Sequence, residues 1–239
     1  MAFQPRFLIV NADDFGRNSG INEGIMAAHQ NRIVTSASLM VRWPHALAAA
    51  EYARSQPDLS IGLHFDLGEW MFRGGAWHPE YVVVERSDAA AVEREIRSQL
   101  ATFRELMGRE PTHMDSHQHV HRKEPVRAIV RGVGDELGIP VREMDCRVRF
   151  CGAFYGQTKA GARCAEGITV EALIDVLRGL KPGFTELACH PAAEADLIST
   201  YRTERLEELE TLCDPRIQAA VRELRIELCS FHRLASAGA

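Results

Sequence analysis

The stretch FLIVNADDFG, residues 7–16, places two acidic residues directly after a short apolar run. Residues 7–12 are mostly aliphatic, β-branched or aromatic, which is typical of a buried strand, and Asp13 and Asp14 come where that strand ends. Ser19 is placed to cap a helix that follows. A buried strand that leads directly into a helix indicates the first unit of an α/β fold.

The same alternation of short apolar runs and helical patterns continues to the end of the chain, as in βα units around a parallel sheet. Further strands are predicted at residues 36–41, 59–65, 112–117, 139–143, 184–190 and 225–231. Helices are predicted at residues 44–55, 89–108, 125–138 and 170–180, with two more between 200 and 224. Two stretches without periodicity are predicted to be long loops, residues 67–88 and 145–168.

A chain of 239 residues can form one α/β unit around a single core, so we expect one domain covering residues 1–239. Strands that alternate with helices can close into a barrel or lie open as a doubly wound sheet, and the pattern alone does not decide between them. In both architectures ligands bind beyond the carboxyl ends of the strands, so polar residues at those ends are the candidates for function.

The composition is that of an ordinary soluble globular protein, with 26% charged and 46% hydrophobic residues. A net charge of -5 argues against a nucleic-acid partner, because such binding depends on clustered Lys and Arg. The first apolar run, FLIV, is too short for a signal peptide or a membrane span, so we expect a cytoplasmic protein without a membrane partner. The oligomeric state is left open, with a homodimer as one option.

Unusual polar residues recur at the ends of the predicted strands. Asp13 and Asp14 follow the first strand, and His64, His117 and His190 end the third, fourth and sixth. Taken alone, each histidine is more often a surface residue or a hydrogen-bonded core residue. Since the carboxyl ends of parallel strands share one rim, their joint placement predicts a functional site there.

The chemistry of these residues predicts a metal ion. Asp13 and Asp14 repel each other unless a cation compensates, although one of them could instead cap a turn before Gly16. Two imidazoles with one carboxylate leave an open coordination position, as catalytic sites require. We therefore expect one divalent ion, either Mg²⁺ or Zn²⁺. Imidazole ligands favour Zn, Co, Mn or Fe over Mg.

The segment HMDSHQHVH carries four of the ten histidines. If it is extended, its odd positions share one face, and Gln118 points away from a metal bound there. His113 lies near the start of the strand, so a packing role is expected for it. His117 is the first candidate ligand, and His119 and His121 stay unassigned.

Other hydrolase and nucleotide chemistries lack their sequence signals. The chain has no GxSxG motif and no glycine-rich phosphate loop, and its six cysteines show no CxxC spacing. Cys189 is adjacent to His190, but neighbouring residues of a strand face opposite sides. A serine or cysteine nucleophile is therefore not expected.

At these residues and over nearly its whole length, the chain resembles the YdjC-like carbohydrate deacetylase family. The resemblance is carried by motifs whose shared order and spacing make it specific. They are LIVNADDFG at 8–16, IVTSAS at 33–38, IGLHFDL at 61–67, PTHMDSHQHVH at 111–121, AFYG at 153–156 and CHPA at 189–192.

The resemblance implies a TIM-like (β/α) barrel, here of about seven parallel strands, with the active site at its carboxyl-terminal rim. It implies metal ligands at Asp14, His64 and His117. It also implies that Asp13 and His190 form an acid–base pair, with Asp13 as the base and His190 as the acid.

Less specific features of the family extend this set. The resemblance implies that Arg142 orients an active-site carboxylate and that Phe154 and Tyr155 line the sugar site. The chain departs from the family at Gln118, where a histidine is frequent, and residues 67–88 form a shorter segment than in the chitooligosaccharide enzymes. These departures bear on the substrate more than on the chemistry.

The function that the resemblance implies is metal-dependent hydrolysis of the acetamide of an N-acetylated sugar or oligosaccharide. Two alternatives remain at this point. One is another metal-assisted hydrolase such as a phosphoesterase, which typically uses a second metal and additional basic residues. The other is a catalytically silent sugar-binding protein.

Overall fold

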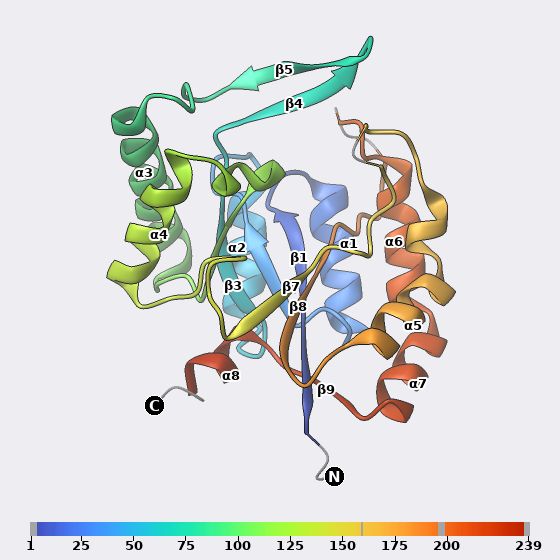
Figure 1. The fold of residues 1–239 in the computed structure, drawn as a ribbon. Coiled ribbons are helices and arrows are strands. Elements are labelled where there is room, and N and C mark those ends of the chain that lie inside the picture. Colours follow the sequence, from blue (N-terminus) through green and yellow to red (C-terminus); the bar gives the residue numbers. More distant parts are fainter. Residues whose placement is uncertain (1–3, 159, 196–198, 237–239) are drawn as a thin grey trace.

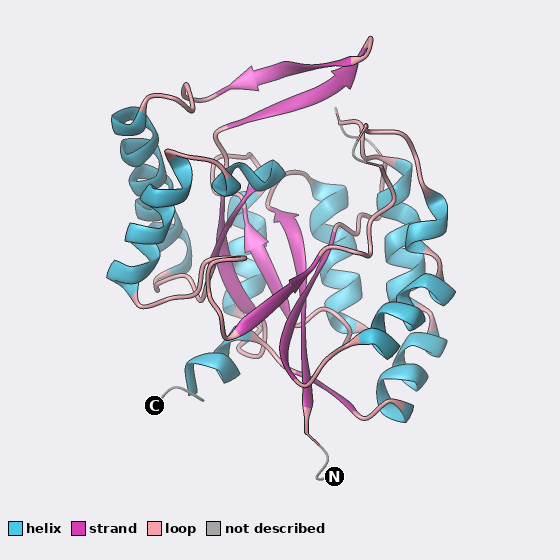
Figure 2. Cartoon of the chain, in the orientation of Figure 1, coloured by secondary structure: helices cyan, strands magenta, loops and turns pink. Residues whose placement is uncertain are grey.

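A curled sheet of parallel strands, flanked by helices, forms the centre of the molecule (Figures 1 and 2). The computed structural model describes residues 4–158, 160–195 and 199–236. The strands of the sheet are β1 (Arg6–Phe15), β2 (Ser36–Leu39), β3 (Ser60–Phe65), β6 (Met114–Ser116), β7 (Val148–Cys151), β8 (Gly183–Cys189) and β9 (Ile226–Leu228).

The strand order is β6-β3-β2-β1-β8-β7, and every pairing in this sheet is parallel. β8 pairs with β1 along Arg6–Ala12. β9 pairs only with the start of β1, whereas β2 pairs with the second half of β1. The sheet curls as a distorted half-barrel with β6 and β7 at the two ends of its path, which confirms the predicted barrel-like α/β fold.

Helices cover the outside of the sheet. In Figure 1, α3 and α4 lie on one side of the strands and α5, α6 and α7 on the other. No helix in the described part of the chain combines the length and apolar character needed to cross a membrane. The helices are α1 (Ser19–Gln30), α2 (Ala46–Arg54), α3 (Ala89–Met107), α4 (Val126–Leu137), α5 (Val170–Gly179), α6 (Thr203–Cys213), α7 (Pro215–Glu223) and α8 (Phe231–Ser236), with short 3₁₀ segments η1 (His117–Arg122) and η2 (Ala165–Ile168).

The prediction that residues 67–88 form a long loop was wrong in part. These residues contain an antiparallel hairpin of β4 (Gly68–Arg73) and β5 (Ala76–Val82), which extends above the carboxyl ends of the parallel strands in Figure 1. β5 is exposed along nearly its whole length, so its sequence carries no apolar alternation by which a strand could be recognised.

Two further predictions were also wrong, one of a strand and one of a helix cap. Residues 139–143 form no strand, and only a single bridge joins Val141 to Met114 of β6. The strand lies later, at β7, inside the predicted loop 145–168. At the amino end of α1, the cap is Asn18 rather than Ser19, because the Asn18 side chain accepts a hydrogen bond from the Ile21 backbone N–H.

The histidine-rich segment is not extended. β6 ends at Ser116, and Gln118 and His119 both adopt left-handed backbone angles with φ of 51°. The predicted alternation of faces therefore fails beyond Ser116. His113 does pack as expected: its ring is buried, lies 3.9 Å from that of Phe231, and occupies the space that the missing side chain of Gly62 leaves free.

The close packing of α1 against the segment after β8 can be tested by substitution of Gly24. A Cβ at Gly24 would lie 2.4 Å from the Cα of Ala192, so Gly24→Ala should destabilise the fold by about 1–3 kcal/mol. Gly132 of α4 has open space around it, so Gly132→Ala should stabilise by about 0.5–1 kcal/mol. Urea unfolding measures both, and equal stability of Gly24→Ala and the wild type would contradict the close packing.

Candidate active site

A cavity of about 780 Å³ opens at the carboxyl ends of the parallel strands. It is lined by all five rim residues singled out from the sequence, Asp13, Asp14, His64, His117 and His190. They come from the ends of β1, β3, β6 and β8, so the parallel topology brings together side chains that are far apart in the chain.

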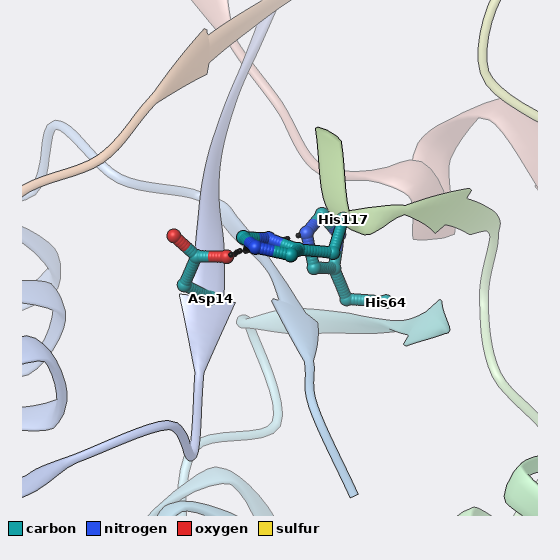
Figure 3. A group of neighbouring side chains, drawn as sticks. All are labelled: Asp14, His64 and His117. Atoms are coloured by element: carbon teal, nitrogen blue, oxygen red, sulfur yellow. Dashed lines mark hydrogen bonds and ion pairs between the residues drawn. The ribbon is translucent and has the colours of Figure 1, made fainter. Parts of the chain in front are cut away.

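Asp14, His64 and His117 form a compact, buried group in this cavity (Figure 3). The Asp14 Oδ1 atom lies 3.0 Å from His117 Nδ1 and 3.4 Å from His64 Nε2. All three candidate ligand atoms lie within 4.8 Å of one another. Asp14 has a left-handed φ of 68°, and the pairing of β1 with β2 is irregular between Ala12 and Phe15. The end of β1 is thus a local distortion of the strand.

The His64 ring is oriented by a second carboxylate. Its Nδ1 lies 2.7 Å from Asp115 Oδ1, which leaves Nε2 directed at Asp14. A carboxylate behind a histidine is the usual support of a metal-binding imidazole. Burial lowers the pKa of His64, but the carboxylates of Asp115 and Asp13 outweigh burial and raise this pKa to about 10. The surrounding negative charge therefore favours a cation at this position.

Asp13 is held by the buried guanidinium of Arg142. The Arg142 Nη1 and Nη2 atoms each donate a hydrogen bond of 2.7 Å, one to each Asp13 oxygen. Arg142 also contacts Asp115 at 2.6 Å and Glu186 at 2.7 Å. Burial raises the pKa of Asp13, but Arg142 outweighs burial, and the pKa lies below its usual value. Asp13 is therefore an ionised carboxylate.

His190 lies on the other side of Asp13. Its Nε2 is 3.7 Å from Asp13 Oδ2, and its Nδ1 is 3.7 Å from Glu208 Oε1. The Glu208 carboxylate also accepts hydrogen bonds from the His190 backbone N–H and the Tyr201 hydroxyl. The His190 imidazole thus lies between two carboxylates, with Nε2 on the side of Asp13 and Nδ1 on the side of Glu208.

The two aromatic residues assigned to the sugar site differ in exposure. Phe154 borders the cavity, but its side chain is fully buried in the hydrophobic core. Tyr155 is 37% exposed, stacks on Tyr201 at 4.5 Å and lies edge-on to His190 at 5.4 Å. Tyr155 is thus the one of the two whose ring is open to a ligand.

Sequence reasoning missed the contribution of α6. Arg205 donates a hydrogen bond to Asp14 Oδ2, on the opposite side of the carboxylate from the histidines. Burial raises the pKa of Asp14, but Arg205 and His117 outweigh burial and hold it well below its usual value. Arg205 and Glu208 lie one turn apart on the buried face of α6. In the sequence they stand among other charged residues, so no local signal separates them.

His119 and His121 form a separate group with Glu143. His121 Nδ1 lies 2.6 Å from Ser116 Oγ, and its Nε2 is 3.6 Å from Glu143, whose carboxylate is bound by Arg122. Burial lowers the pKa of His121 to about 4 and keeps the imidazole neutral. These histidines therefore do not join the group around Asp14.

Comparison with known proteins places the chain in a family. Residues 7–223 match the family of YdjC-like proteins. The chain is 35% identical to a carbohydrate deacetylase of Geobacillus stearothermophilus, with 95% of this chain and 97% of that protein covered. It is 34% identical to a chitooligosaccharide deacetylase of Klebsiella pneumoniae (strain 342), with 95% and 98% covered.

Solved structures show the same fold. A protein of Enterococcus faecalis V583 with a proposed role in cellobiose-phosphate cleavage has a TM-score of 0.75 at 26% identity, covering 96% of this chain and 99% of that chain. A family 4 carbohydrate esterase of Streptomyces lividans in complex with acetate has a TM-score of 0.53 at 13% identity, covering 95% and 93%. From its sequence match and the similarity to these relatives, the chain belongs to the YdjC-like family.

Proposed function

We propose that this protein is a metal-dependent carbohydrate deacetylase that removes the acetyl group from N-acetylated oligosaccharides. The observation that carries the proposal is the position of the Asp14, His64 and His117 group beside Asp13 and His190 in one cavity. The names of the relatives from Geobacillus stearothermophilus and Klebsiella pneumoniae support this reaction and a chitooligosaccharide-like substrate.

The residues present fit a divalent ion. Asp14 Oδ1, His64 Nε2 and His117 Nδ1 face one another, and Asp115 and Arg205 occupy the remaining polar atoms of His64 and Asp14. When bound, the ion would supply Lewis-acid polarisation of the amide carbonyl or of a water. Two imidazoles suit Zn²⁺ and related ions on ligand softness, and Mg²⁺ is the alternative.

The protein's own side chains can move the two protons that amide hydrolysis requires. Asp13, kept ionised and oriented by Arg142, accepts a proton from the water whose oxygen bonds to the acetyl carbon. His190, whose Nε2 lies 3.7 Å from Asp13 Oδ2, acts as the acid and donates a proton to the sugar nitrogen as the C–N bond breaks. The products are acetate and a free amino sugar. Asp13 and His190 thereby hold the roles of base and acid.

The reaction itself is tested by measuring acetate. We expect release from N-acetylglucosamine oligomers by the metal-loaded protein, and loss of that release in EDTA followed by recovery when Zn²⁺ or Mg²⁺ is added. Phosphate esters are assayed in parallel. Turnover of the esters without acetate release would favour a phosphoesterase, and oligomer binding without turnover would favour a silent sugar-binding protein.

The metal ligands are tested by removing them. Asp14→Ala and His117→Ala should lose bound metal and at least about 100-fold in turnover, because each removes one of three ligands from an open site. Asp175→Ala, at an exposed carboxylate of α5, serves as the matched control. Metal analysis of the purified proteins decides the assignment: variants that retain the wild-type metal content would refute it.

The base is tested by Asp13→Asn, which keeps the size of the side chain but removes its ability to accept a proton. We expect kcat to fall by about 10²-fold or more while the metal content stays at the wild-type level. Steady-state acetate release and metal analysis measure the two quantities. A variant with undiminished kcat would exclude Asp13 as the base.

A further inference from the structure

The β4–β5 hairpin contacts the body of the protein mainly through β4. Glu69 and Met71 are buried, whereas nearly all of β5 is exposed. Figure 1 shows the hairpin extending across the end of the molecule at which the parallel strands finish. Trp70 and Trp77 of this hairpin line the same cavity as Asp13 and His117. The hairpin is thus one wall of the site.

Gln118 attaches this wall to the metal-binding segment. Its Oε1 accepts a hydrogen bond of 2.9 Å from the Trp70 backbone N–H, and its Nε2 donates one of 2.8 Å to the Trp70 carbonyl. The side-chain amide thereby pairs with β4 much as a neighbouring strand would. Gln118 directly follows His117 and has a left-handed φ of 51°, which costs on the order of 1–3 kcal/mol for a residue other than glycine. A strained backbone thus directs this side chain at the hairpin.

The hairpin also approaches the opposite wall of the cavity. A Cβ at Gly161 would lie 3.3 Å from the Cβ of Phe72, and Gly161 has a left-handed φ of 72°. Gly161 and the nearby Gln157 line the cavity as well. The hairpin therefore spans the mouth of the cavity, from Gln118 on one side to Gly161 on the other.

Of the two indoles on the hairpin, Trp77 is the open one. Trp77 is 50% exposed, and its ring meets Phe72 edge-on at 5.4 Å. Trp70 has the Arg86 guanidinium 3.8 Å from its ring centre, and Arg86 also lines the cavity. An indole offers a flat apolar face and one N–H donor, and the arginine offers further donors. A pyranose ring has the complementary surface, with C–H groups on its faces and hydroxyls around its edge.

We propose that Trp77, together with Trp70 and Arg86, forms a subsite for a second sugar ring of the substrate, next to the ring that is deacetylated. Gln118 is the positioning residue of this subsite, because it holds the hairpin over the cavity. The assignment rests on the proposed deacetylase function and deepens it. It selects oligosaccharides over monosaccharides as substrates.

The test compares N-acetylglucosamine with its trimer as substrates. Trp77→Ala should lower kcat/KM for the trimer about tenfold more than for the monomer, mainly through KM, because a stacked ring is lost. Gln118→Ala should also lower the ratio of the trimer kcat/KM to the monomer kcat/KM, while the variant retains the wild-type metal content. Leu47→Ala, at an exposed apolar residue of α2 that is not among the cavity-lining residues, should leave the ratio unchanged.

Binding is measured separately from turnover. In the Asp13→Asn background, calorimetric titration with the trimer should show about tenfold weaker affinity when Trp77→Ala is added. Equal trimer affinity with and without Trp77, or an unchanged trimer-to-monomer ratio in both variants, would overturn the subsite while leaving the deacetylase proposal intact. Failure to release acetate from any N-acetylated sugar would overturn the proposed function, and the titration would still decide whether the hairpin binds the trimer.

Discussion

The site depends on one buried ionic contact, between the guanidinium of Arg142 and the carboxylates of Asp13, Asp115 and Glu186. These carboxylates come from three strands, β1, β6 and β8, so a single cation joins the centre of the sheet to one of its ends. Burying several charges is costly unless each is paired and hydrogen-bonded, and removal of one partner leaves the others uncompensated. The cluster therefore fixes the geometry of the rim.

The same cluster links the two halves of the proposed chemistry. Asp115 contacts both Arg142 and His64, so the residue that supports a candidate metal ligand shares its cation with Asp13. Three carboxylates around one guanidinium leave excess negative charge, and the pKa of Glu186 is raised to about 7, first by burial and then by its acidic neighbours. A cation bound beside His64 would reduce this excess. A proton on His64, whose pKa is raised to about 10, offsets the same excess, so the surrounding charge is compatible with a cation at this position.

The sequence predicts the buried strands and the rim that their ends share. It does not predict backbone angles or helix faces that depend on tertiary contacts. β1, β3 and β8 were predicted close to their observed positions because buried parallel strands are continuous apolar runs. Their polar ends could be assigned to one rim from topology alone. The histidine-rich segment was misinterpreted, because left-handed angles at Gln118 and His119 cannot be inferred from residue types that usually avoid them. Arg205 could not be found, since the face of α6 that is buried depends on how the helix docks.

The distortion at the end of β1 places Asp13 and Asp14, two adjacent residues, in the same cavity and so limits how they can change in evolution. Neighbouring residues of a regular strand point to opposite sides, yet Asp13 and Asp14 line the same cavity, because the left-handed angle at Asp14 breaks the alternation. One peptide unit thus separates the proposed proton acceptor from the proposed metal ligand. An insertion or deletion at this point would disable both at once, so evolution can adjust either residue separately only by altering the side chains that surround the doublet.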